Sequence, residues 1–428
     1  MKLEFGYGKT VQAVECPAKN LMGILRANAM EHERSGEAAV EYALAHPVDS
    51  KPLRELVRTG QKVAVITSDI SRPMPSYEVL PSVLDELYRG GIRREDITVV
   101  FALGSHRKHT EEEKRHLVGE RVYREVATAD SDPEDYVNFG TTSRGTPIDV
   151  TRTVAEADVR ICVGNIEFHY FAGFSGGVKA LMPGVSTWRA IENNHRMTAS
   201  EYAASGLLDG NPVREDIEEF GQRVGVDFIV NVVLDEKKHT VYAVAGHPVT
   251  AHRVGVEYLR RMYRIPIEKR ADIVLVSQGG APKDGNLYQS QKALENAKYA
   301  VRPGGTIILI AACGEGFGSA VVEQWMLCAQ TPADAYARVK REYQLGAHKA
   351  VAIFRVLENA EVDLVSELEP DYVRRLHMVP KASAQEALDD ALKRYGPDAA
   401  VLAMPYGGAT MPYAKELQSG ENRDTIKQ

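Results

Sequence analysis

The sequence predicts an α/β protein with mostly parallel sheets in two domains. Apolar, β-rich runs recur along the chain, end in glycine or polar residues, and alternate with helical stretches. Continuous apolar runs of this kind suit strands that are buried on both faces, as in a parallel sheet. The alternation of strands with helices favours α/β layers. The 428 residues allow two or three domains at about 150 residues each.

The expected elements follow one another in chain order. Strands are predicted at 62–69, 97–104, 159–167, 272–280, 305–313 and 399–408, and helices at 76–91, 110–126 and 383–396. Thr110 and Glu113 have the T-x-x-E spacing of a capping box, which places a helix start directly after the loop that contains His106. That loop then lies at the carboxyl end of a strand, where open α/β sheets bind ligands.

Composition and charge exclude several classes of protein. Lys+Arg 52 against Asp+Glu 59 gives a net charge of -7, which does not favour general nucleic-acid binding. Four cysteines without a CxxC pair favour neither a disulfide framework nor a zinc knuckle. The start has no signal-peptide pattern, and the apolar runs are shorter than the ~18–20 residues that span a bilayer. We therefore expect a soluble cytoplasmic protein that binds neither nucleic acid nor membrane.

Two strand-to-helix loops carry polar side chains suited to chemistry. In TSDISRPMPS (67–76), Asp69 and Arg72 follow a strand, and an arginine there can hold a carboxylate or phosphate through two hydrogen bonds. Taken alone, this segment favours the alternative of a turn stabilised by Asp69 with a surface arginine. In the next loop, a helix start and two basic neighbours favour the neutral, base-competent form of His106 and His109. Solvated loop histidines would have the same pattern.

The glycine-rich segment GNIEFHYFAGFSGGVKALMPGVS (164–186) is the most informative one. It combines His169, four glycines and Lys179. The lysine stands one place late for a Walker A loop and lacks the following hydroxyl residue, so a nucleoside-triphosphate kinase is disfavoured. A histidine and a lysine in such a loop can supply a base and a reactive amine. A close-packed loop is the structural alternative.

Two further segments are individually weak. His195 lies in WRAIENNHRM (188–197) with no second ligand at helical spacing, so a zinc site has little support. In the helix that follows the strand at 272–280, Tyr288 and Lys292 are spaced i,i+4 and share a face with the neighbouring Gln289. Lys292 could hold a substrate carboxylate, although an ordinary amphipathic helix gives the same pattern. Neither a G-x-S-x-G nor a G-x-G-x-x-G motif is present.

Together these five segments resemble the lactate racemase family. The motifs occur in the family's order: SDISRP, GSHRKHTEEE, EFHYFAGFSGGVKA, ENNH and YQSQK. The resemblance covers nearly the whole chain, and the glycine-rich segment is its most specific part.

The resemblance implies a nickel-pincer cofactor, the Ni(II) complex of a pyridinium-3,5-bisthiocarboxylic acid mononucleotide. By residue match, Lys179 forms the covalent attachment and His195 is the protein ligand of nickel. Sulfur donors in a near-planar four-coordinate site suit Ni(II). Asp69 and Arg72 match the region that contacts the cofactor.

The resemblance also implies an activity, racemisation or epimerisation of a small 2-hydroxy acid. His106 and His169 match the two acid–base histidines, and the Cα hydrogen leaves and returns as a hydride through the pincer. The substrate would be bound by Arg72, Tyr288, Gln289 and Lys292. The expected partners are this acid and the proteins that make the pincer, while the oligomeric state stays open.

The family fold implies two α/β domains with the active site in the cleft between them. The first would comprise 1–268 plus 404–428, and the second 269–403. No tryptophan follows residue 340, where the lactate enzymes are expected to have an aromatic wall, so Phe354 is expected to replace it. This departure favours a 2-hydroxy acid larger or more polar than lactate.

Two alternatives stay open. One is a metal-independent enzyme in which His106 and His169 exchange the Cα proton directly. The other is a non-catalytic nickel or cofactor carrier. The presence of both histidines together with Gln289 and Lys292 favours an enzyme, and retention of the Cα hydrogen in heavy water distinguishes hydride transfer from proton exchange.

Overall fold

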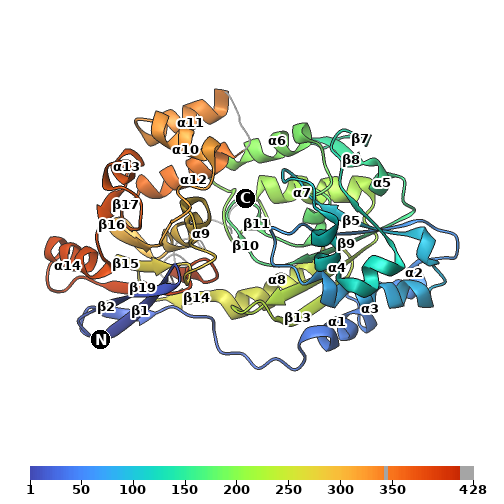
Figure 1. Ribbon diagram of the computed structural model, residues 1–428, viewed down its shortest axis with the longest axis horizontal. Helices are drawn as coiled ribbons and strands as arrows, with labels where there is room; N and C mark the ends of the chain where they lie inside the picture. The colour runs from blue at the N-terminus through green and yellow to red at the C-terminus, as the bar shows by residue number, and fades with distance from the viewer. Residues whose placement is uncertain (342–345, 415–428) are drawn as a thin grey trace, which may run out of the picture. The chain divides into compact units, whose positions relative to one another are not determined.

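The computed structural model describes residues 1–341 and 346–414, and the chain divides into two compact units (Figure 1). Unit 1 comprises residues 1–29 and the chain from 261 onward, and unit 2 comprises residues 30–260. Each unit is built around a six-stranded sheet. The predicted α/β class with mostly parallel sheets is confirmed.

The sheet of unit 2 has the strand order β13-β12-β9-β4-β5-β6. All its neighbours are parallel except β12 and β13. The three strands predicted in this part of the chain are confirmed as β4, β5 and β9. The strands are β4 (Val63–Ser68), β5 (Ile97–Ala102), β6 (Ala127–Asp130), β9 (Val159–Asn165), β12 (Phe228–Leu234) and β13 (Thr240–Gly246).

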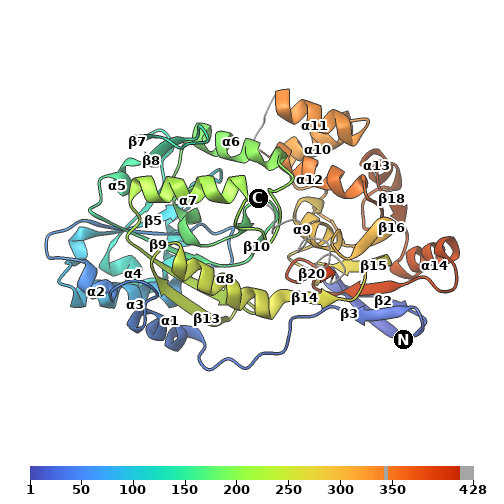
Figure 2. The same cartoon turned by 180° about the vertical axis from the view of Figure 1, so that it is seen from behind.

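Helices cover both faces of this sheet because alternate strand residues are apolar on each side. Val63 and Val65 of β4 belong to the core beneath α1, α3 and α4. The short helix η2 contacts β4, β9, β12 and α7, and Figure 2 shows α7 on the opposite side of the sheet from α1 and α3. The helices of unit 2 include α1 (Gly36–Ala45), α2 (Leu53–Leu56), α3 (Ser76–Arg89), α4 (Glu111–Glu125), α5 (Arg152–Ala155), η2 (Gly177–Ala180), α6 (Trp188–Arg196) and α7 (Pro212–Val224). Helix α8 (Thr250–Tyr263) leads to unit 1.

The sheet of unit 1 is parallel throughout, in the order β18-β17-β16-β15-β19-β3. One face, with Val274 and Val276, packs against α9, α10 and α12, and the opposite face, with Ile273 and Leu275, packs against α14. The strands are β3 (Leu21–Ile24), β15 (Ala271–Ser277), β16 (Val301–Ile310), β17 (Ala360–Val365), β18 (Val379–Lys381) and β19 (Val401–Met404). The helices are α9 (Leu287–Ala297), α10 (Ala320–Cys328), α11 (Pro332–Arg341), α12 (Ala347–Leu357), α13 (Pro370–Arg375) and α14 (Ala384–Tyr395).

The division of the chain differs from the expected domains at both ends. The amino-terminal hairpin of β1 (Lys2–Tyr7) and β2 (Thr10–Glu15) lies in unit 1, beside α14 (Figures 1 and 2). Its apolar residues Leu3, Phe5 and Val14 need a sheet face to cover them, and they join the core beneath α14. Strand β3 extends the edge of the same sheet beyond β19.

The carboxyl-terminal stretch also stays with unit 1. Strand β20 (Met411–Ala414) pairs in parallel with β14 (Arg264–Ile267), and both belong to unit 1. The boundary between the units falls at Arg260, before the expected position of 268. Residues 415–428, assigned to the first domain by the sequence, lie outside the described residues.

The units also show where Phe354 lies and how long the apolar helices are. Phe354, expected to line the substrate site, is 1% exposed and packs in the core beneath α12. The apolar stripe of an amphipathic helix buries it, so it replaces no aromatic wall. In the part of the chain that the structure describes, no helix is both long enough and apolar enough to span a membrane.

The predicted capping box at the start of α4 is present. Thr110 Oγ1 accepts a hydrogen bond from the Glu113 main-chain N–H (3.2 Å), and Glu113 Oε2 accepts one from the Thr110 N–H (2.9 Å). These bonds satisfy two amides that the helix itself leaves without partners.

We predict that Thr110→Ala lowers the free energy of unfolding by about 0.5–2 kcal/mol, because the helix loses its cap. Urea denaturation followed by circular dichroism measures this change. Thr110→Ser is the matched control, since it keeps the Oγ acceptor, and it should unfold near the wild-type midpoint. Equal losses in both variants would contradict a capping role.

Candidate active site

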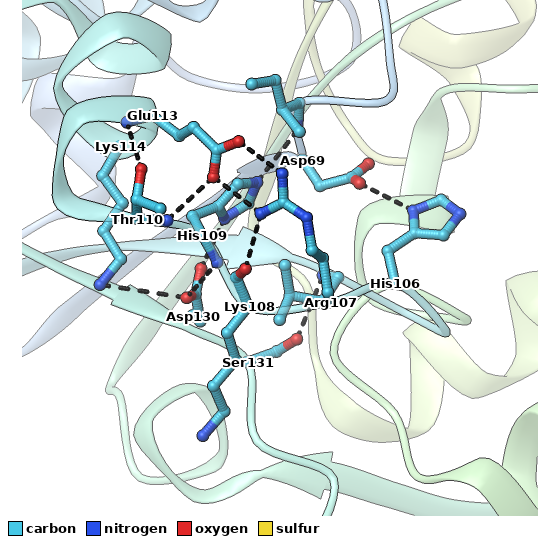
Figure 3. Close-up of polar contacts among 12 residues, drawn as sticks. Asp69, His106, Arg107, Lys108, His109, Thr110, Glu113, Lys114, Asp130 and Ser131 are labelled. Atoms are coloured by element: carbon cyan, nitrogen blue, oxygen red, sulfur yellow. Dashed lines mark hydrogen bonds and ion pairs between the residues drawn. The ribbon is translucent and has the colours of Figure 1, made fainter.

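Asp69 and His106 form a hydrogen-bonded pair at the carboxyl ends of β4 and β5. His106 Nδ1 lies 2.7 Å from Asp69 Oδ2, and the two side chains point toward each other in Figure 3. The Asp69 side chain is 4% exposed and that of His106 is 39% exposed. A carboxylate can only accept, so Nδ1 carries the proton and Nε2 carries the lone pair. His106 is therefore a candidate general base at Nε2.

Asp69 is held in its charged form. Burial alone would raise the pKa of this carboxyl, but the hydrogen bond from His106 and the charges of His106 and Arg72 lower it overall. Ser71 Oγ donates a further hydrogen bond to Asp69 Oδ1 (2.9 Å). The segment 67–76 thus does more than form a turn with a surface arginine, because it orients His106.

His109, the other histidine of this loop, has a structural role. Its Nδ1 lies 2.6 Å from Asp130 Oδ1, and its Nε2 accepts a hydrogen bond from the Ile70 main-chain N–H (3.1 Å) (Figure 3). Both ring nitrogens are occupied and its side chain is 1% exposed. His109 therefore ties the loop after β4 to the end of β6, which holds Asp69 in place.

The glycine-rich segment forms a tight hairpin of β10 (Phe168–His169) and β11 (Gly173–Phe174), followed by η2. Gly173 has φ +75°, and a Cβ there would lie 1.9 Å from the Leu207 carbonyl oxygen. Only glycine fits both the conformation and the space. The predicted close approach of main chain in this segment is thus explained by packing within unit 2.

Buried side chains far along the chain hold the main chain of this segment. Asn211 Nδ2 donates to the Phe171 carbonyl (2.9 Å), and Arg214 donates to the Ala172 carbonyl through Nε (3.2 Å) and to the Phe174 carbonyl through Nη2. His252 Nε2 donates to the Ser175 carbonyl (2.8 Å), and Asn231 Oδ1 accepts from the Gly177 N–H (2.7 Å). We call Asn211, Arg214, Asn231 and His252 the clamp residues; each is at most 1% exposed.

The ring of Phe171 brings three of the predicted site residues together. The centroids of Phe171 and His169 are 4.5 Å apart, and those of Phe171 and His195 are 4.8 Å apart. The Nζ atom of Lys179 lies 5.7 Å from the same ring centroid. A candidate base, a candidate metal ligand and a candidate nucleophilic amine therefore surround one aromatic side chain.

Positive charges around this cluster disfavour further protonation. Burial lowers the pKa of His169 well below its ordinary value, and the charges of Lys179, Arg72, His195 and Arg214 lower it further. Burial likewise lowers the pKa of Lys179 well below its ordinary value, assisted by Arg214 and Arg72. A neutral imidazole can accept a proton and a neutral amine can act as a nucleophile.

Helix α6 presents His195 in a defined tautomer. Its Nδ1 lies 3.1 Å from Asn194 Oδ1, an acceptor, so Nε2 carries the lone pair that a metal requires. Asn194 Nδ2 in turn donates to the buried Asp216 (2.8 Å). The amino terminus of the helix is fixed by Asp149, which accepts from Thr187 Oγ1 (2.7 Å) and from the Arg189 guanidinium.

The remaining predicted residues lie in unit 1, on the first turns of α9. Asn286 caps this helix by accepting the Gln289 N–H (3.0 Å), and Gln289 and Lys292 are exposed. The half-buried Tyr288 contacts Lys349, whose Nζ lies 3.2 Å from the Tyr288 ring centroid and donates to the Tyr288 carbonyl (3.0 Å). The placement of these three residues relative to the two histidines stays a prediction.

Sequence patterns missed the residues that support the site. Phe171 stood within the glycine-rich motif, but nothing marked its ring as the contact for His169, His195 and Lys179. The clamp residues have no local signature, apart from Asn211, which stands directly before Pro212 and α7 in the pattern of a helix cap. Within the described residues, no group of three or more His, Cys, Asp or Glu side chains could hold a metal.

Comparison with known proteins agrees with the resemblance seen in the sequence. Residues 7–206 match the lactate racemase N-terminal domain and residues 267–411 match the lactate racemase C-terminal domain. The chain is 32% identical over 417 residues to the lactate racemase of Thermoanaerobacterium thermosaccharolyticum, covering 95% of this chain and 97% of that protein. It is 31% identical to the lactate racemase of Lactiplantibacillus plantarum, covering 95% and 98% respectively.

Solved structures give the same result. The lactate racemase apoprotein of Thermoanaerobacterium thermosaccharolyticum matches with a TM-score of 0.89 and covers 96% of this chain and 100% of that one. A protein from Thermotoga maritima, 19% identical, shares the fold with a TM-score of 0.67 over 90% of this chain and 100% of its own. The chain therefore belongs to the lactate racemase family and is an isomerase of the racemase type.

Proposed function

We propose that the protein is a nickel-pincer-dependent racemase or epimerase of a small 2-hydroxy acid. The observation that supports this most strongly is the cluster around Phe171, where His169, His195 and Lys179 meet. Membership of the lactate racemase family supports the substrate class.

The residues present fit the pincer cofactor. A neutral Lys179 amine is the form that can make a covalent bond to a thiocarboxyl group. His195 offers one imidazole lone pair, so a nickel ion here needs further donors, which the pincer carries as sulfur and carbon. When bound, the pincer would supply the electron sink that hydride transfer from the substrate Cα requires.

His106 is suited to exchange the hydroxyl proton of the substrate. Loss of hydride from Cα is favoured as the hydroxyl oxygen loses its proton, because the product is then a planar 2-keto acid. His106 Nε2 can take this proton while Asp69 stabilises the imidazolium that forms. The buried, charged Asp69 thus gives His106 its orientation.

His169 starts from a different arrangement. Its Nδ1 accepts a hydrogen bond from the Ala172 main-chain N–H (3.3 Å), so its proton lies on Nε2. That N–H can hold the oxygen of the keto acid. To give this proton to the oxygen, His169 must first be protonated at Nδ1, which breaks the long bond from Ala172.

The substrate carboxylate would be held by Lys292 and Gln289, with Tyr288 lining the pocket and Arg72 near the reacting carbon. These assignments follow the family match. A fixed carboxylate lets the planar keto acid rotate and present its other face to the hydride donor without dissociating from the site. The proteins that make the pincer are expected partners, and a cytoplasmic location stays a prediction.

We predict that protein loaded with the pincer inverts a 2-hydroxy acid in heavy water and retains the Cα hydrogen. A panel of enantiopure 2-hydroxy acids, including lactate and larger or more polar ones, is analysed by chiral chromatography and mass spectrometry. Deuterium at Cα would contradict hydride transfer and favour direct proton exchange by two bases. Absence of inversion across the panel would contradict the proposed activity.

The same assay tests the two histidines. His106→Gln and His169→Gln should each lower turnover by about 10²–10⁴-fold, the usual contribution of an acid–base group. His116→Gln is the matched control, because His116 is exposed on α4, and its turnover should equal that of the wild type. Turnover above a tenth of the wild-type value in either active-site variant would contradict its role.

We also predict separate effects at the attachment point and the nickel ligand. Lys179→Ala should abolish the covalent mass increase seen after production with the pincer-making enzymes, because no amine remains to form the bond. His195→Ala should keep the mass increase of the organic part while losing most of the nickel. Intact-mass spectrometry and metal analysis measure the two quantities. A full mass increase in Lys179→Ala, or full nickel in His195→Ala, would refute the respective assignment.

A further inference from the structure

Arg214 is a fully buried cation whose side-chain hydrogen bonds go to the main chain of the glycine-rich segment. It stands in the first turn of α7 and is 0% exposed. Burial lowers the pKa of its guanidinium to about 10, so it keeps its charge at neutral pH. Among the residues that the structure describes, its Nη1 atom has no hydrogen-bond partner.

The guanidinium fixes the turn that carries His169 at one end and leads to Lys179 at the other. Its Nε and Nη2 atoms donate to the carbonyls of Ala172 and Phe174, which flank Gly173. A planar guanidinium holds two acceptors at a set spacing, which a lysine ammonium does not. The next clamp residue along the segment, His252, binds the Ser175 carbonyl.

The charge of Arg214 also acts on the amine of Lys179. The charged and titratable groups around this amine come from separate elements: Arg214 from α7, Arg72 from the loop after β4, and His169 from β10. Like charges this close disfavour the ammonium form. Geometry and charge therefore both connect Arg214 to the reactivity of Lys179.

We propose that Arg214 is a positioning residue for cofactor attachment, which fixes the turn between His169 and Lys179 and adds a positive charge beside the lysine amine. The proposal rests on the proposed function in that Lys179 is the attachment point. Arg214 itself need not touch the cofactor.

The test measures the reactivity of Lys179 in the full-length protein without cofactor. Competitive labelling with acetic anhydride, read by peptide mass spectrometry over a range of pH, gives the midpoint at which Lys179 becomes reactive. In the wild type this midpoint should lie below that of the surface lysines as a group. In Arg214→Met it should rise by about one pH unit, because a neighbouring positive charge is lost.

Arg214→Lys separates position from charge. It keeps the positive charge, so the Lys179 midpoint should stay near the wild-type value. It loses the two-carbonyl geometry, so the fraction of chains that carry the pincer, measured by intact mass, should fall several-fold. If Arg214→Met does not fold, Arg214→Lys alone tests the proposal. A fraction of pincer-carrying chains in Arg214→Lys equal to that of the wild type would overturn the proposal.

Arg160 provides the matched control. It also donates to two main-chain carbonyls, those of Val154 (3.0 Å) and Ala155, from a partly buried position in unit 2. Arg160→Met should lower the melting temperature without moving the Lys179 midpoint. If Arg214→Met lowers the melting temperature in the same way and leaves the midpoint unchanged, Arg214 is merely structural. If wild-type Lys179 carries no pincer, the proposed function is refuted. The labelling result would still show whether Arg214 affects the reactivity of Lys179.

Discussion

The hydrogen bonds that satisfy the main chain of residues 171–177 are the constraint on which the site depends. Apart from the short pairing of β10 with β11, this segment is irregular and largely buried, so its remaining carbonyl and amide groups need other partners. Asn211, Arg214, Asn231 and His252 supply those partners from α7, β12 and α8. Because the segment carries His169 and leads directly to Lys179, the same bonds that make it foldable also fix the candidate chemistry.

The electrostatics of the site follow from this construction. A buried arginine in the clamp, together with Arg72, places positive charge beside Lys179 and His169, and both respond by favouring their neutral forms. Asp69, by contrast, keeps its negative charge and accepts the Nδ1–H hydrogen bond of His106, which fixes the orientation of that ring. Unit 2 thus holds an amine and an imidazole that resist protonation, together with a second imidazole whose Nδ1–H is bound by a carboxylate.

Much of the fold and the candidate site could be predicted from the sequence because the signals are local. Apolar runs located the strands, Thr110 and Glu113 located a helix start, and His106, His169, Lys179 and His195 stood in or beside recognisable motifs. The clamp residues could not be found in this way, since each contact joins residues 40 to 77 positions apart. The place of the β1–β2 hairpin could not be predicted either, because an apolar face does not specify which sheet covers it. Phe354 shows the same limit, since an aromatic in an amphipathic helix suits a core as well as a pocket.

The unequal settings of the two histidines bear on how a racemase can treat two mirror-image substrates. His106 is held by a carboxylate at Nδ1 and offers a lone pair at Nε2, whereas His169 receives an amide N–H at Nδ1 and offers an N–H at Nε2. In the resting protein His106 can therefore take a proton at Nε2, and His169 can donate a hydrogen bond to an oxygen from its Nε2. For the opposite enantiomer this arrangement must be reversed, which requires His169 to change its tautomer and His106 to begin protonated. The Ala172 bond is long at 3.3 Å, so His169 gives up little when its tautomer changes, and the Asp69 bond keeps the Nδ1 proton of His106 in place throughout.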